Sequence, residues 1–113
     1  MLSSVFASHK RNLLCCCGLA FFIFLVFSPC LKAGFVNWDD DVHLLENPFI
    51  KSLSPAGLHD LFTTAVNKTY IPLTSLSFAL EYHFFRTDPF PYHLDNLLLH
   101  ILVSILVFLF ALQ

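Results

Sequence analysis

The sequence predicts an all-α, polytopic membrane protein with two transmembrane helices on either side of a loop that carries short interfacial helices. Its 113 residues are 57% apolar, with a mean hydropathy of +0.71. Only 12% are charged, whereas a soluble domain of this size carries roughly 25%. The chain has two apolar runs, residues 13–27 and 92–112. With their flanking residues included, both reach the length of about 20 residues that a helix needs to cross a bilayer. The lipid bilayer is therefore an expected partner of this chain.

The first expected span covers residues 12–31 and follows a short polar tail over residues 1–11. A cleaved signal peptide has a similar basic start and apolar middle. A signal peptidase site requires a small residue three positions before the cleaved bond, and this is missing at Leu31-Lys32-Ala33. The sequence is also a poor match to a lipoprotein box at Phe27-Ser28-Pro29-Cys30. We therefore predict an uncleaved helix. Its cluster of three adjacent cysteines is interpreted as small apolar packing, with lipidation near the membrane edge as the alternative.

The orientation follows from the basic residues before the first span. Lys10 and Arg11 favour a cytoplasmic N-terminus under the positive-inside rule. Loop 32–91 is then extracytoplasmic, outside a bacterial inner membrane or in the lumen of the endoplasmic reticulum of a eukaryote. The net charge of −2 is too small to indicate a nucleic-acid partner.

Two short helices are expected in the loop. Ser54 reads as an N-cap with Pro55 at the first helical position, opening a helix through residue 62. Pro72 opens a second helix over residues 73–85. One stripe of this helix is apolar: Leu73, Leu76, Leu80 and Phe84. The stripe predicts a helix that lies along the membrane interface, or one that packs on neighbouring helices.

The second expected span covers residues 92–113, after a break in the chain at Asp88-Pro89-Phe90-Pro91. Its polar residues fall within a helical stripe of about 60°. They are His93, Asn96, His100 and Ser104. Polar groups are unfavourable against lipid, so this stripe should face protein or a wet cavity. Two spans supply few partners for it, so we expect the chain to be the N-terminal part of a longer polytopic protein.

An acidic turn follows the first span, at Phe35-Val36-Asn37-Trp38-Asp39-Asp40-Asp41. Adjacent like charges near a membrane surface are unfavourable unless something uses or neutralises them. The alternative is an ordinary solvated turn, because Asp and Asn are common turn formers. Asp41, His43 and Glu46 form a weak pattern for metal ligands without a supporting cluster, so no metal and no cofactor are predicted. The sequence contains no phosphate-binding glycine loop, zinc pair or nucleophile elbow.

Several motifs in order carry a resemblance to a known family. They are the first span, residues 35–41, Glu46-Asn47-Pro48, Ile71-Pro72-Leu73-Thr74-Ser75-Leu76-Ser77 and Pro91-Tyr92-His93-Leu94-Asp95-Asn96-Leu97-Leu98-Leu99-His100. The segment from Phe35 to Leu112 resembles membrane glycosyltransferases of the C superfamily. More narrowly, it resembles the transmembrane and tetratricopeptide-repeat O-mannosyltransferases and their bacterial relatives.

This resemblance implies an enzyme that moves a mannose-type sugar from a polyprenyl-phosphate donor to a hydroxyl on a protein or glycan acceptor. The residues matching the family's acidic pair are Asp39, as general base, and Asp40, which would position the acceptor or tune Asp39. Asp41 has no clear counterpart in the family. The family's acidic pair can therefore be aligned with Asp39 and Asp40 or, shifted by one residue, with Asp40 and Asp41. Any tetratricopeptide repeats would lie downstream.

Further substrate-binding candidates are Asp41, Arg86, His93, Asn96 and His100. The leaving phosphate requires a cation, for which Arg86 and Lys68 are the options in the loop. Two other classes remain open. In a small structural or interaction protein the stripe on the second span would contact another helix, and in a transporter or channel fragment it would line a pathway.

Overall fold

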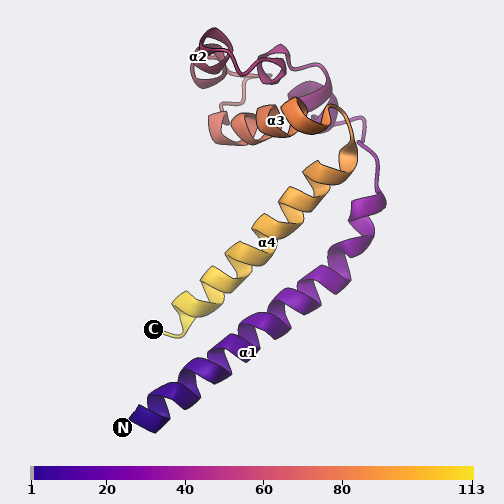
Figure 1. Cartoon of the computed structure of the whole chain (residues 1–113). Helices are drawn as coiled ribbons and strands as arrows, with labels where there is room; N and C mark the ends of the chain where they lie inside the picture. The colour runs from indigo at the N-terminus through magenta and orange to yellow at the C-terminus, as the bar shows by residue number, and fades with distance from the viewer. Residues whose placement is uncertain (1) are drawn as a thin grey trace. The chain divides into compact units, whose positions relative to one another are not determined.

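The computed structural model describes residues 2–113, with side chains from residue 9 onward, and these residues form helices and no β-strand. The elements are α1 (Leu2–Phe27), η1 (Ser28–Lys32), η2 (Asp41–Leu45), η3 (Pro48–Lys51), α2 (Pro55–Thr63), α3 (Pro72–Phe85) and α4 (Pro89–Ala111). Figure 1 labels the α-helices among them. The chain divides into two compact units. We call residues Met1–Lys32 with His93–Gln113 the membrane unit, and residues Ala33–Tyr92 the loop unit. The prediction of an all-α protein is confirmed.

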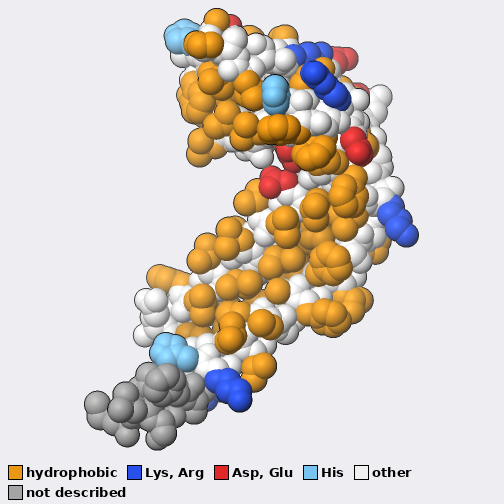
Figure 2. Space-filling model, in the orientation of Figure 1, with side chains coloured by type: hydrophobic (Ala, Val, Ile, Leu, Met, Phe, Trp, Pro, Cys, Tyr) orange, Lys and Arg blue, Asp and Glu red, His pale blue; other side chains and the backbone are white. Residues whose placement is uncertain are grey.

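The membrane unit contains two helices long and apolar enough to cross a bilayer, His9–Lys32 and Pro89–Ala111. Large apolar side chains remain exposed along both, and hydrophobic side chains cover them in Figure 2. Phe22 and Phe110, for example, are 66% and 78% exposed. A long helix that is apolar all round and buries few of its residues is suited to lipid contact. The chain is thus an integral membrane protein. Its first helix begins at Leu2, inside the segment expected to form a tail.

Helix α4 begins at Pro89, three residues before the predicted start. Asp88 Oδ1 accepts a hydrogen bond from the backbone N–H of Phe90 at 3.1 Å. Pro89 and Pro91 fit the first turn because N–H groups there have no intrahelical acceptor. The expected break at residues 88–91 is therefore the start of the helix itself.

A small hydrophobic core holds the loop unit together. Leu44, Ile50, Leu61, Ala79 and Tyr92 are at most 2% exposed and form one cluster. The core joins α2, α3, α4 and the short turns η2 and η3. The Tyr92 hydroxyl donates a hydrogen bond of 2.6 Å to the backbone oxygen of Arg86. The start of α4 is thereby tied to the chain that leaves α3.

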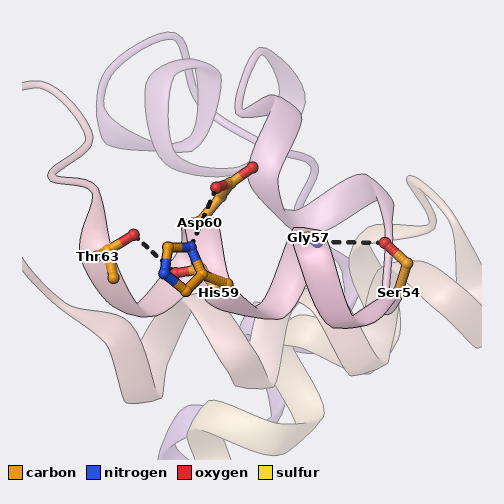
Figure 3. A network of polar contacts seen from close by, with 5 residues as sticks. All are labelled: Ser54, Gly57, His59, Asp60 and Thr63. Atoms are coloured by element: carbon orange, nitrogen blue, oxygen red, sulfur yellow. Dashed lines mark hydrogen bonds and ion pairs between the residues drawn. The ribbon is translucent and has the colours of Figure 1, made fainter.

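Helix α2 begins as the sequence predicts. Ser54 Oγ accepts a hydrogen bond from the backbone N–H of Gly57 at 3.2 Å (Figure 3). Pro55 occupies the first helical position. The same figure shows the Thr63 hydroxyl bonded to the backbone oxygen of His59 in the last turn. A Cβ atom on Gly57 would lie 2.5 Å from the backbone oxygen of Ser52. Glycine is therefore required where η3 leads into α2.

Helix α3 packs against the core through small residues. Ser75 and Ala79 are buried, and their short side chains let α3 approach η3 closely. In contrast, Leu73 and Phe84 from the predicted apolar stripe are 75% and 71% exposed. Most of the stripe therefore stays uncovered within the loop unit, as expected for a helix at a membrane interface.

Candidate functional site

The acidic turn is a tight turn that leads into a helical segment. The backbone N–H of Trp38 donates to the oxygen of Val36 at 2.8 Å, and the chain becomes helical at Asp39. Residues Asp41–Leu45 then form a π-helical turn, closed by a bond of 2.8 Å from Glu46 N–H to the oxygen of Asp41. Such wide turns are rare and frequently occur at functional sites.

A buried asparagine secures the end of this π-helical turn. The Asn47 side chain is 1% exposed. Its Nδ2 donates to the backbone oxygen of His43, and its Oδ1 accepts from the backbone N–H of Phe49, both at 3.0 Å. The amide therefore connects η2 to η3 and uses both of its polar atoms. Pro48 follows at the first position of η3.

The two carboxylates at the start of the helical segment have different environments. Asp40 is half-buried, and its Oδ2 accepts a hydrogen bond from the backbone N–H of Val36 at 2.9 Å. Asp39 is exposed, and its carboxylate has no hydrogen bond to another described residue. Asp40 thus closes the turn, whereas Asp39 is available to a ligand. Trp38, directly before the pair, is 79% exposed.

Both carboxylates line one pocket of the loop unit with a volume of about 320 Å³. Its lining residues are Asp39, Asp40, His43, Thr69, Ile71, Thr74 and Phe78. Asp41 does not line it, which favours Asp39 and Asp40 as the pair. A volume of this size lies at the lower end of the range of about 300–1,000 Å³ for small-molecule pockets.

A tight two-residue turn brings Thr69 to this pocket. Val66 and Thr69 exchange two backbone hydrogen bonds of 3.0 and 2.9 Å. The residues between them, Asn67 and Lys68, have φ angles of 48° and 64°, as a type I′ turn requires. Asparagine favours such a conformation. Lys68 directly precedes Thr69 in the chain and is exposed.

The other candidate cation, Arg86, lies at the far end of α3. Its guanidinium carbon is 5.3 Å from the ring centroid of Tyr82. Arg86 follows Phe78, the last pocket residue of α3, by eight positions, or about 12 Å along a helix axis. Of these two candidates, Lys68 is the one adjacent in sequence to a residue that lines the pocket, Thr69.

The predicted polar stripe of the second span lines a different pocket, within the membrane unit. This pocket has a volume of about 260 Å³ and is lined by Phe27, Cys30, His93, Asn96, Leu97 and His100. The rings of Phe27 and His100 meet edge to face, with centroids 5.2 Å apart. Ser104, the fourth polar residue, donates to the backbone oxygen of His100 at 2.8 Å instead. The stripe and the carboxylate pair belong to separate units, each with its own pocket.

Three polar residues of the pocket, His43, Thr69 and Thr74, were absent from the catalytic prediction, as were its apolar residues Ile71 and Phe78. His43 was weighed only as a metal ligand, although it lies four positions after Asp39 in a helical segment. Thr74 lies inside the motif 71–77, and Thr69 next to Lys68. Within residues 2–113, no group of three His, Cys, Asp or Glu side chains is arranged to hold a metal ion. The available chemistry is that of carboxylates, an imidazole, hydroxyls and two apolar side chains.

Two proteins of Drosophila melanogaster are similar in sequence to this chain. Protein O-mannosyl-transferase Tmtc3 is 34% identical in an alignment 110 residues long, which covers 88% of this chain and 11% of that protein. Protein O-mannosyl-transferase Tmtc1 is 37% identical in an alignment 114 residues long, which covers 92% of this chain and 13% of that protein. The chain thus resembles the transmembrane O-mannosyltransferases predicted from its motifs, and spans about an eighth of their length or less. No family profile and no solved structure match it.

Proposed function

We propose that this chain is part of an integral-membrane glycosyltransferase that moves a mannose-type sugar from a polyprenyl-phosphate donor to a hydroxyl group of a protein. The observation that carries this proposal is the pairing of Asp39 and Asp40 on one pocket of the loop unit. The two similar proteins, both named as protein O-mannosyltransferases, support the choice of sugar and acceptor. A lipid-linked donor suits a chain with two bilayer-crossing helices.

In the proposed reaction Asp39 is the general base. Its carboxylate takes the proton of the acceptor hydroxyl while the hydroxyl oxygen attacks the anomeric carbon of the sugar. The bond from that carbon to the phosphate oxygen breaks, and its electron pair leaves with the polyprenyl phosphate. A positioned base of this kind contributes about 10²–10⁴-fold to a rate. Asp40, held by the backbone of Val36, orients the acceptor beside Asp39.

The leaving phosphate of the donor requires a cation. Lys68, next to the pocket residue Thr69, is our candidate for this contact. We keep His93, Asn96 and His100, which line the pocket of the membrane unit, as candidates for polar contacts with a substrate. We assign no role to Asp41, and Arg86 is the weaker choice of cation. We also propose that the N-terminus is cytoplasmic and the loop unit extracytoplasmic, in the lumen of the endoplasmic reticulum.

Substitution of the three aspartates one at a time tests this function. In the full-length protein, Asp39→Asn should reduce mannose transfer from a polyprenyl-phosphate donor by at least 100-fold. Asp40→Asn should reduce it less, because an amide oxygen can still accept from Val36. Asp41→Asn is the matched control and should remain within about twofold of the wild-type rate. Unchanged transfer in both Asp39→Asn and Asp40→Asn, at normal protein levels, would remove the catalytic assignment.

A further inference from the structure

We infer that His43 binds the sugar of the donor, in a monosaccharide subsite shared with Thr69, Thr74 and Phe78. This inference rests on the proposed function and deepens it, because it names which part of the substrate the pocket holds. It starts from the imidazole of His43, which lines the pocket together with Asp39 and Asp40.

The ring of His43 has a polar atom that the protein leaves unused. Nδ1 is buried from solvent and has no hydrogen-bond partner among the described residues. A buried ring nitrogen without a partner is unfavourable and calls for an explanation such as a ligand. Rotation of the ring by 180° about the Cβ–Cγ bond exchanges the positions of Nδ1 and Cδ2. Either orientation keeps the ring on the pocket wall, and the flipped one moves Nδ1 out of its buried position.

The backbone of His43 is fixed, which limits the positions that its side chain can reach at the pocket. Its backbone oxygen accepts the hydrogen bond of the buried Asn47 amide at 3.0 Å. The next residue, Leu44, is 2% exposed and belongs to the core. A side chain that is positioned before the ligand arrives loses little entropy on binding.

The composition of the pocket selects a neutral ligand rich in hydroxyl groups. The carboxylates of Asp39 and Asp40 would repel a phosphate placed among them. The two carboxylates accept hydrogen bonds from hydroxyls, whereas the side chains of His43, Thr69 and Thr74 can both donate to hydroxyls and accept from them. Ile71 and Phe78 offer apolar contact to ring carbons. A volume of about 320 Å³ suits one sugar ring rather than an oligosaccharide.

Steady-state kinetics of the full-length protein with polyprenyl-phosphate mannose as the probe tests this assignment. His43→Leu removes both ring nitrogens and should raise KM for the donor about tenfold, the loss expected for one well-placed hydrogen bond, with kcat within about twofold. His43→Asn places an amide near the Nδ1 position and His43→Gln near Nε2. One of them should restore KM to within about threefold of the wild type.

His59→Leu is the matched control, because His59 belongs to the loop unit but lies on α2, outside the pocket, with its side chain 74% exposed. It should leave KM unchanged. If His43→Leu does not fold, His43→Asn is compared with His43→Gln. The inference is overturned if both of these variants have the same KM for the donor as the wild-type protein. An unchanged KM in folded His43→Leu would also overturn it. In either case loss of transfer in Asp39→Asn would leave the proposed function intact, whereas a wild-type protein without transfer would refute that function itself.

Discussion

The side-chain amide of Asn47 donates a hydrogen bond of 3.0 Å to the backbone oxygen of His43, and so closes the π-helical turn from within the core. The bond connects a buried residue to the pocket wall. The bond also stabilises the wide helical turn, because it supplies a hydrogen-bond donor to the backbone oxygen of His43. The geometry of the pocket thus depends on a residue that does not line it.

Asn47→Ala should therefore destabilise the loop unit. The substitution leaves the His43 oxygen and the Phe49 N–H without their partners, at a cost of about 3 kcal/mol in the free energy of unfolding. Thermal unfolding of the full-length protein in detergent measures the effect. Asn37→Ala, at an exposed position of the same unit, should stay within about 0.5 kcal/mol. Equal melting temperatures for the two variants would contradict this role of Asn47.

Gly57→Ala should destabilise the same unit for a steric reason. The added Cβ would lie 2.5 Å from the backbone oxygen of Ser52, so the chain before α2 must shift. We expect a loss of about 1–3 kcal/mol, the range for overpacking. Gly34→Ala is the control, because a Cβ there meets no atom within 4 Å. If both alanine variants unfold at the wild-type temperature, the close approach at Ser52 is not a constraint.

Lys68→Gln should weaken binding of the donor through its phosphate. Because the residue is exposed, the loss of its charge should raise KM for polyprenyl-phosphate mannose by about threefold to tenfold, with a larger effect at low salt. Lys51→Gln removes a charge at the end of η3, outside the pocket, and should have no such effect. A KM for Lys68→Gln that equals the wild-type value at low ionic strength would exclude this lysine as the phosphate contact.

The sequence Asn67-Lys68-Thr69 provides a test of the proposed topology. It is a formal N-glycosylation acceptor, and Asn67 is exposed at the tip of the tight turn. Expression in eukaryotic cells should therefore add one glycan to a luminal loop, seen as a gel shift that a glycosidase removes. Asn67→Gln should abolish the shift, and Thr69→Ser should retain it. A wild-type protein without the modification would argue against a luminal loop unit.

The starts of α2 and α3 were predictable because their signals are local. Ser54 with Pro55, and Pro72, act within one helical turn of the backbone that they affect. The predicted start of α4 is three residues too late, because the prolines at 89 and 91 are as typical of a break in the chain as of the first turn of a helix. The buried face of α3 was not foreseen either. It depends on how closely Ser75 and Ala79 approach η3, which is a property of the folded unit.

The candidate site shows the same limit. Asp39 and Asp40 were identified from adjacent carboxylates and from motif order, and they do line a common pocket. Thr69 reaches that pocket only through the positive φ angles of Asn67 and Lys68, and the π-helical turn depends on the buried amide of Asn47. The pocket as a whole joins residues 39–43 to residues 69–78, which are far apart in the sequence, so no local pattern predicts it. His43 was within reach of prediction through its spacing of four from Asp39.

The exposure of Trp38 provides a built-in optical probe. It is the single tryptophan of the 113 residues, is 79% exposed and stands directly before Asp39. Indole emission shifts to shorter wavelength when water is replaced by lipid headgroups, and tryptophan is enriched at that boundary. The fluorescence of this chain can therefore report whether the carboxylate pair sits in bulk water or at the bilayer surface.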